Sequence, residues 1–355
     1  MSRHYIGSDC IEGFAFRISG RQPASKIHSA QKLFKTGDYL LVRRSLYGSD
    51  FRERAPRADF DGICSADILT IREISQKIVD GYLIAVLYSK ELWNFIVSNS
   101  TGSLTRRIKW SQLKDFEFLL PPEDFQKYIV DLLWAMERTK DAYKALIKQY
   151  DELVKSQFVE MFGERFSTCR IKLEQIATST IGLTYKPENT SDGEGTIVLR
   201  SGNIQDGELD IKTDIVRVAG IVIPESKYVH PGDILMCSRN GSASLVGKCC
   251  RITECEEEMA FGAFMTVIRS QYPSFLYGFF QSQYFKEQLS NVGTTSINQI
   301  TTKMLNAYET VMPTMEEEER FSLFLTETDK SKLATRQALE SLEKSQKAIM
   351  NKVYG

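Results

Sequence analysis

The sequence has few histidines and no paired cysteine motif. Only three histidines occur, His4, His28 and His230, and they are far apart along the chain. The seven cysteines form no Cys-x-x-Cys pair, and Cys249 and Cys250 are adjacent. This spacing argues against a disulfide framework and against a zinc site, and it predicts reduced, mostly buried thiols. The scattered histidines also give no basis for a catalytic triad.

Long hydrophobic runs and a strong net charge are missing too. The longest apolar run, Tyr82–Tyr88, is far shorter than the roughly 18 residues of a membrane-spanning helix, and the polar start is no signal peptide. We therefore expect no membrane contact and a cytoplasmic location. A net charge of −1 argues against a strongly basic, autonomous nucleic-acid binder. Residues 1–119 carry 18 basic and 13 acidic side chains, and residues 164–314 carry 14 and 17. If the chain binds DNA, partners must supply part of the backbone contacts.

Motifs of the common catalytic chemistries are absent. There is no Walker loop and no Gly-x-Gly-x-x-Gly. There is also no Asn-Pro-Pro or Asp-Pro-Pro followed by an aromatic residue, the block that holds the target amine in adenine-N6 methyltransferases. We expect no catalysis, no cofactor and no metal ion in this chain.

What the sequence does contain is an internal repeat. Gly37-Asp38 and Gly232-Asp233 lie 195 residues apart, and each pair precedes an apolar strand and an arginine-containing turn. Further matches follow in the same order: 99–108 with 291–300 and 113–122 with 305–314, both at an offset of 192, and Lys-Ser-Gln at 155 and 344. The constant order and nearly constant offset predict one unit repeated in tandem.

Glycine and proline are absent from two long stretches, 124–162 and 316–353. The first carries a seven-residue row of Ile129, Met136, Tyr143 and Tyr150 with companions Leu132, Leu146 and Leu153; the second carries the weaker row Phe321, Thr328, Thr335, Leu342 and Ile349, with Phe324 and Ala338 alongside. Heptad rows predict coiled-coil helices. We expect antiparallel packing, because a parallel pair would need a long return connection that the short junctions do not offer.

Short apolar runs separated by Gly, Asn, Ser and Asp turns predict mixed domains in the other segments. The expected fold class is α/β (α+β), with two mixed domains joined by two long antiparallel coiled-coil helices in a pseudo-two-fold tandem repeat. The expected segments are a first mixed domain at 1–119, a first spacer helix at 120–163, a second mixed domain at 164–314 and a second spacer helix at 315–355. The second domain opens with a helix-like segment and a strand, Lys172–Tyr185, that the first domain lacks at its amino end.

Polar side chains at the predicted turns suit contact with DNA. A guanidinium such as Arg239 pairs with guanine, and a carboxamide such as Asn240 pairs with adenine, although Asn-Gly is also the preferred dipeptide of a hairpin turn. Arg43 and Arg44 hold the parallel place in the first domain, where at most one can reach a base because adjacent strand residues point opposite ways. The remaining candidates, for phosphates or bases, are Arg106, Arg107, Lys109, Arg200, Asn203, Ser242, Thr294, Thr295, Ser296 and Asn298. A solvated loop is the alternative for the polar sets at 106–109 and 294–298.

The order of these features resembles the DNA-specificity (S) subunits of type I restriction-modification systems, in which two target-recognition domains alternate with two long helices. The resemblance extends over nearly the whole chain, and it is carried by 60–71, 153–163, 199–209, 232–248, 293–300 and the proline-terminated ends of both domains.

The resemblance implies a non-catalytic subunit that reads a bipartite, asymmetric target in double-stranded DNA, with the helices setting the spacing. It further implies two methyltransferase (modification) subunits that methylate adenine and a restriction subunit that cleaves. S-adenosylmethionine and ATP would then be bound by those partners and not by this chain. The alternative from another class is a coiled-coil adaptor that binds proteins only, without DNA specificity, and an enzyme is third.

Overall fold

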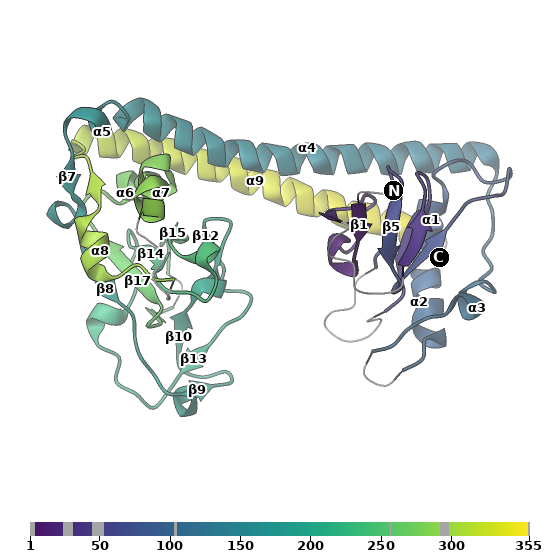
Figure 1. Cartoon of the computed structure of the whole chain (residues 1–355), viewed down its shortest axis with the longest axis horizontal. Helices are drawn as coiled ribbons and strands as arrows, with labels where there is room; N and C mark the ends of the chain where they lie inside the picture. Colours follow the sequence, from purple (N-terminus) through teal and green to yellow (C-terminus); the bar gives the residue numbers. More distant parts are fainter. Residues whose placement is uncertain are drawn as a thin grey trace. The chain divides into compact units, whose positions relative to one another are not determined.

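The computed structural model describes residues 4–23, 31–44, 53–102, 105–255, 257–291 and 298–353. The chain divides into two compact units, unit 1 (1–146 and 335–355) and unit 2 (147–334). Each unit contains a mixed domain of helices and strands together with part of both long helices (Figure 1). The predicted mixed fold with two long helices is therefore confirmed. The segment boundaries at 119, 163 and 314 stay a prediction.

The two long helices are α4 (Glu123–Phe162) and α9 (Met315–Val353). The first turn of each helix contains acidic side chains, which interact favourably with the positive, N-terminal end of the helix dipole. In unit 1, Lys140 of α4 contacts Gln346 of α9, and in unit 2 Asp151 contacts Lys332. Further along α4 in unit 2, Phe158 lies against Phe321, which is earlier in α9 than Lys332, so the helices run antiparallel in this unit. No helix in the described ranges is both long and apolar enough to cross a membrane.

Most residues of the two predicted heptad rows are buried or half-buried, as expected of a seam between helices. Ile129, Met136 and Phe321 are buried. Leu153, however, is 47% exposed, and its neighbour Val154 is buried in its place. A straight α-helix has 3.6 residues per turn and drifts from a strict heptad by about 20° per repeat, which moves the buried stripe by one position along α4.

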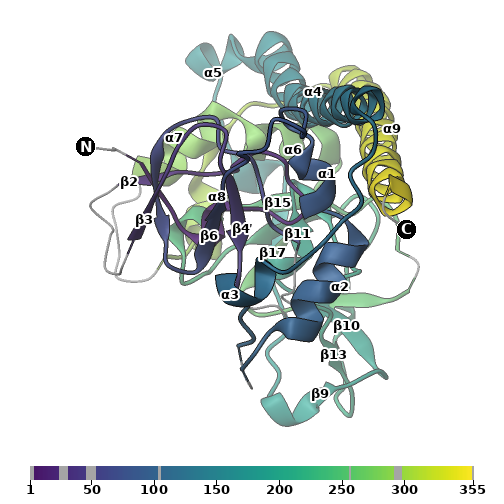
Figure 2. The same ribbon diagram turned by 90° about the vertical axis from the view of Figure 1, so that its right-hand side faces the viewer.

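The described residues of unit 1 form two small sheets and, besides the long helices, three short α-helices. The strands are β1 (His4–Ile6), β2 (Gln22–Pro23), β3 (Gln31–Phe34), β4 (Tyr39–Val42), β5 (Gly62–Ser65) and β6 (Ile68–Ile71), and the helices are α1 (Leu83–Leu87), α2 (Lys90–Asn99) and α3 (Trp110–Leu113). The first sheet has the order β2-β1-β5-β3, and β4 pairs with β6. Helices α1 and α2 pack against β4 and β6, with Tyr39, Leu41 and Leu69 in the shared core (Figure 2).

Unit 2 has the same plan with more strands. Its strands are β7 (Ile171–Lys172), β8 (Thr178–Ile181), β9 (Thr190–Ser191), β10 (Thr196–Leu199), β11 (Ile204–Gln205), β12 (Glu208–Leu209), β13 (Arg217–Val218), β14 (Ile234–Cys237), β15 (Cys249–Arg251), β16 (Met259–Phe261), β17 (Met265–Arg269) and β18 (Glu309–Thr310). Its helices, besides its parts of α4 and α9, are α5 (Arg165–Thr168), α6 (Pro273–Gln281), α7 (Gln283–Asn291) and α8 (Thr302–Ala307). The two main sheets have the orders β16-β10-β13-β9 and β15-β14-β17-β8.

Helix α6 joins the sheets of unit 2 to the long helices. Gly278 on α6 allows a close approach, since a Cβ there would lie 2.5 Å from Cδ2 of Phe158 and 2.7 Å from Cε1 of Phe321. Those two rings come from α4 and α9 and are fully buried in the same core as α6. The mixed domain of unit 2 is therefore packed directly onto its stretch of helix pair.

The tandem repeat is visible in matched structural details. Buried Asp38 accepts hydrogen bonds from Nε and Nη2 of Arg72 at 2.7 and 2.6 Å, and buried Asp233 accepts both from Arg269 at 2.9 Å. The glycine before each aspartate has a φ of +92°, which only glycine adopts readily. The strand pairs β4–β6 and β14–β17 also have the same register. The repeat that the sequence predicts is therefore a repeat of structure.

The two units differ at one sheet edge. In unit 2, β17 pairs with β14 on one side and with β8 on the other. Its equivalent in unit 1, β6, pairs only with β4 among the described residues. Strand β1 corresponds to β10, because each pairs in parallel with the equivalent strand, β5 or β16. The described part of unit 1 thus has no counterpart of β7 and β8, and the short amino end of this domain stays a prediction.

Candidate nucleic-acid interface

The turn that follows β14 is fixed by its backbone. The N–H groups of Ser238 and Arg239 donate to the carbonyl of Phe264 at 3.0 and 3.1 Å, and the N–H of Ile300 donates to the carbonyl of Ser238 at 2.7 Å. Arg239 also forms an isolated antiparallel bridge with Gln299. The backbone at Arg239 is therefore held on two sides while the residue itself is exposed.

The Arg239 side chain lies over an aromatic ring. Its Cζ atom is 5.2 Å from the centroid of the Phe264 ring, a cation–π distance. Within the described ranges, no carboxylate pairs with this guanidinium. The ring restricts the side chain without using its N–H donors, so Arg239 is a positioned cation with its hydrogen-bonding groups available to a ligand such as a guanine edge.

The equivalent turn in unit 1 identifies which arginine corresponds to Arg239. The N–H of Arg43 donates to the carbonyl of Asp67 at 3.0 Å, and the N–H of Ile108 donates to the carbonyl of Arg43 at 3.1 Å. Arg44 bridges Arg107 in the antiparallel sense, as Arg239 bridges Gln299. Arg43 therefore takes the place of Ser238, and Arg44 takes the place of Arg239.

The charge environment of the two turns is different. Asp67 stands where unit 2 has Phe264, and it pairs with both Arg44 and Arg107, at 3.0 and 2.9 Å. The guanidinium groups of Arg44 and Arg107 are each paired with the Asp67 carboxylate, whereas that of Arg239 lies over the Phe264 ring. The Nε of Arg43 donates to the carbonyl of Ala66 at 3.0 Å. The arginines of unit 1 thus have internal partners that Arg239 lacks.

The side-chain amides of Asn240 and Asn298 form hydrogen bonds within the protein. Nδ2 of Asn240 donates to Oγ of Ser201 at 3.1 Å, and its Oδ1 accepts from the N–H of Ser242 at 2.9 Å. Nδ2 of Asn298 donates to the carbonyl of Gly241 at 3.1 Å. The amide of Asn240 therefore closes an Asx turn at Ser242.

Asn203 is a structural residue, and this corrects its place among the DNA-binding candidates. It is buried, its Oδ1 accepts from the N–H of Arg200 at 2.8 Å, and its Nδ2 donates to the carbonyl of Asp210 at 3.0 Å. A buried amide with both groups satisfied has nothing left to offer a base. Arg200 is half-buried and pairs with Asp214 at 2.5 Å, at the edge of the same turn.

The remaining candidates are distributed between the two turns. In unit 1, Arg106 is half-buried and donates to the carbonyl of Ser100 at 3.5 Å, and Lys109 is exposed at the start of α3. In unit 2, Ser242 is exposed, and its Oγ contacts Oγ of Ser244 at 2.9 Å. Thr294, Thr295 and Ser296 lie outside the described residues.

Comparison with known proteins identifies this architecture. No protein-family model matches the chain. The StySPI specificity subunit of the type I restriction enzyme of Salmonella potsdam and the EcoKI specificity subunit of Escherichia coli (strain K12) are each 27% identical to it over 186 residues. The match covers 49% of this chain and 40% of each relative, so it spans less than half the length of these curated relatives.

A solved structure extends the likeness in fold. A chain from work on the complex assembly and conformational transition of the type I restriction-modification system has a TM-score of 0.59 at 17% identity, over 98% of this chain and 90% of that chain. At this identity the match shows the fold alone, and it agrees with the two mixed domains and two long helices described above. The chain is therefore similar in sequence to two type I specificity subunits over about half of its length, and similar in fold to the matched structure over nearly all of it.

Proposed function

We propose that this chain is the DNA sequence-recognition subunit of a type I restriction-modification complex and carries no catalytic site of its own. Each unit reads one half of a bipartite target through the turn after β4 or β14. The observation that carries this proposal is the pair of repeat-equivalent arginine turns, fixed by the same backbone hydrogen bonds. Because Asp67 replaces Phe264, the two turns present different chemistry, and the target is asymmetric.

The partners follow from the same proposal. Two methyltransferase subunits dock on the chain and methylate adenine with S-adenosylmethionine, and a restriction subunit adds ATP-dependent cleavage. The names of the curated relatives and the assembly context of the matched structure support association with other subunits of a type I restriction-modification system. The near-neutral charge of the chain supports it as well, since partners would then supply many of the phosphate contacts.

Selection from a random DNA library tests the function. The chain, assembled with a type I methyltransferase subunit from the same host, is incubated with the library at physiological salt, and the bound DNA is sequenced. We expect two conserved half-sites separated by a constant number of unread base pairs. Retention without any sequence preference would favour the coiled-coil adaptor instead.

Arg239 provides a prediction within this experiment. Arg239→Ala should relax only the half-site read by unit 2, at a cost of about 1 to 3 kcal/mol if the contact is to a base. Arg217→Ala is the matched control, because Arg217 is in the same domain and pairs with Glu257 at 2.8 Å. An equal loss on all sequences with a shallower salt dependence would instead identify Arg239 as a phosphate contact.

A further inference from the structure

Two repeat-related lysines are buried within the long helices. Lys140 of α4 and Lys332 of α9 lie 192 residues apart, the offset that relates other parts of the two repeats, and they are 3% and 5% exposed. A buried ammonium group is costly unless it is paired and hydrogen-bonded. The partners of each lysine therefore indicate what the position does.

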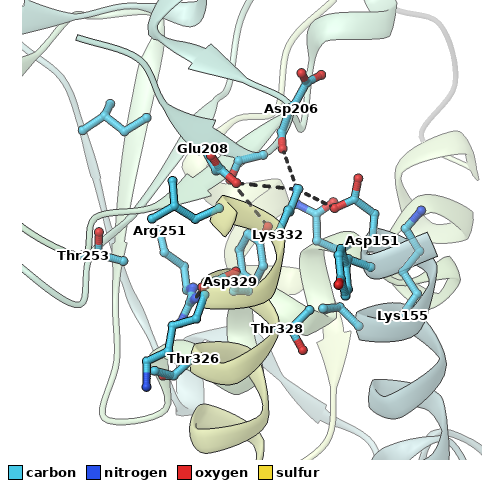
Figure 3. Close-up of a pocket in the computed structure, with 18 residues that line it drawn as sticks. Asp151, Lys155, Asp206, Glu208, Arg251, Thr253, Thr326, Thr328, Asp329 and Lys332 are labelled. Atoms are coloured by element: carbon cyan, nitrogen blue, oxygen red, sulfur yellow. Dashed lines mark hydrogen bonds and ion pairs between the residues drawn. The ribbon is translucent and has the colours of Figure 1, made fainter. Parts of the chain in front are cut away.

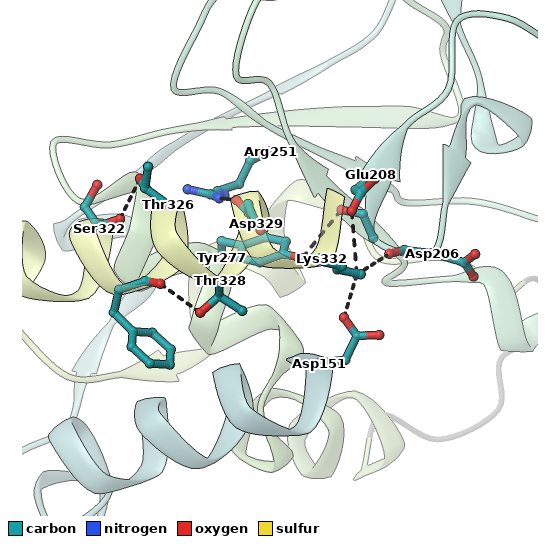
Figure 4. A network of polar contacts seen from close by, with 12 residues as sticks. Asp151, Asp206, Glu208, Arg251, Tyr277, Ser322, Thr326, Thr328, Asp329 and Lys332 are labelled. Carbon is teal, nitrogen blue, oxygen red and sulfur yellow. Dashed lines mark hydrogen bonds and ion pairs between the residues drawn. The ribbon is translucent and has the colours of Figure 1, made fainter. Parts of the chain in front are cut away.

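In unit 2, Lys332 joins three elements. Its Nζ lies 2.6 Å from Oδ1 of Asp151 on α4, 3.6 Å from Oε1 of Glu208 on β12 and 3.4 Å from the carbonyl of Asp206 (Figure 4). Asp206 and Glu208 flank the tight turn of the hairpin formed by β11 and β12. One ammonium group thus links α9, α4 and a hairpin of the recognition domain.

The hairpin and the long helices line a common cavity around this contact. The cavity has a volume of about 630 Å³, and Lys332, Asp151 and Glu208 are among the side chains that line it (Figure 3). Arg251 of β15 pairs with Asp329 on α9, one turn before Lys332. The Lys332 contacts thus link the hairpin to both long helices at the edge of this cavity, beside the Tyr277 hydroxyl of α6, which donates to the carbonyl of Gly207 at 3.5 Å.

In unit 1 the equivalent lysine occupies an equivalent joint. Nζ of Lys140 lies 3.0 Å from Oε2 of Glu137 and 3.1 Å from Oε1 of Gln346 on α9. It also lies 5.9 Å from the ring centroids of Phe14 and Phe16, which belong to the mixed domain.

The two joints correspond at the level of the segment. Ile6 of β1 pairs with Cys64, and Leu199 of β10 pairs with the equivalent Phe261, an offset of 193 that puts Phe14 in the place of Gly207, next to Glu208. Phe14 and Gly207 both have positive φ, +54° and +78°. Each buried lysine therefore meets its own helix pair on one side and the same segment of its recognition domain on the other. The partner is a carboxylate in unit 2 and an aromatic ring in unit 1.

We propose that Lys140 and Lys332 are positioning residues that fix the orientation of each recognition domain on its stretch of the helix pair. On the proposed function, on which this inference rests, that orientation decides where each arginine turn meets the duplex. The two lysines then help to determine the number of base pairs accepted between the half-sites, without contacting DNA.

Lys332→Met tests the joint in the free chain. Methionine keeps the length of the side chain and removes its charge, and the variant should fold because the side chains of Asp151 and Glu208 are 44% and 48% exposed and stay hydrated. Lys330→Met is the matched control, since Lys330 is 67% exposed and pairs only with Glu327 in the described ranges. We expect amide hydrogen exchange at 204–209 to become at least tenfold faster than in the control, with β14 unchanged. Equal exchange in the two variants would overturn the proposal.

The spacer measurement separates positioning from stability. With DNA libraries that vary the number of base pairs between the half-sites, the Lys332→Met complex should keep both half-sites and accept neighbouring spacer lengths at least tenfold more readily than wild type. Lys332→Arg, which keeps the charge, should select as wild type does. A spacer as strict in Lys332→Met as in wild type would contradict the proposal. If the wild-type complex selects no bipartite target, the proposed function fails, and hydrogen exchange still decides whether Lys332 holds the hairpin.

Discussion

Removing one heptad from both long helices, Asp141–Ile147 together with Ala338–Lys344, is expected to change the spacer of the DNA target. At about 1.5 Å per residue, each helix becomes roughly 10 Å shorter, which corresponds to about three base pairs at ~3.4 Å each. Three base pairs also turn the groove by roughly 100° around the duplex. We expect either a spacer shortened by a few base pairs with both half-sites retained, or loss of modification because one domain faces the wrong groove.

The deletion keeps the buried contacts between the helices in each unit and removes one exposed ion pair of unit 1, that of Asp141 with Arg17. It falls next to the boundaries between the compact units, at 146/147 and 334/335, and it leaves Lys140 and Gln346 in place. Seven residues preserve the heptad phase, so a four-residue deletion at the same site is the control for lost packing. Methylome sequencing of a host that carries each variant gives the readout. The original spacer with full modification in the seven-residue variant would mean that the helices do not set the spacing.

Lys140→Met should cause a large loss of stability. Its partners Glu137 and Gln346 are 5% and 0% exposed, so the variant leaves a carboxylate buried without a cation. Breaking a buried ion pair in this way costs about 3 to 5 kcal/mol. Urea unfolding of the purified chain measures the loss against Lys144→Met, a control at an exposed position one turn further along α4.

The reason for this loss can be tested separately. Adding Glu137→Leu to Lys140→Met removes the stranded charge and should recover most of the lost free energy of unfolding. Lys332→Met should be milder than Lys140→Met, because the carboxylates around Lys332 are partly hydrated. A cost below about 1 kcal/mol for Lys140→Met would show that Glu137 is solvated when the lysine is gone.

The parts of the fold that can be predicted from the sequence are those with a strong local signal. Two helices without glycine or proline, and the Gly-Asp pairs that open β4 and β14, follow from periodicity and backbone preference. The antiparallel direction of the helices follows from the short connections. A strict heptad pattern does not predict that Val154 is buried in place of Leu153, because the buried face of an α-helix drifts from the heptad positions over several turns.

The candidate site was predicted less completely, because its chemistry depends on contacts between distant residues. Arg43 and Arg44 were equally good counterparts of Arg239 until the hydrogen bonds to Asp67 and Phe264 fixed the register. The difference between Asp67 and Phe264 could have been found by aligning the turns after β5 and β16. Nothing in the sequence distinguishes the buried amide of Asn203 from an exposed one.

The most direct test of the account is single-molecule methylome sequencing of a host with and without this gene, in the presence of its methyltransferase partner. We expect one class of N6-methyladenine motif that appears only in the strain with the gene. This motif should consist of two different half-sites separated by a spacer of constant length whose bases are not read. Identical methylomes in the two strains, or a gene-dependent motif without a spacer, would contradict it.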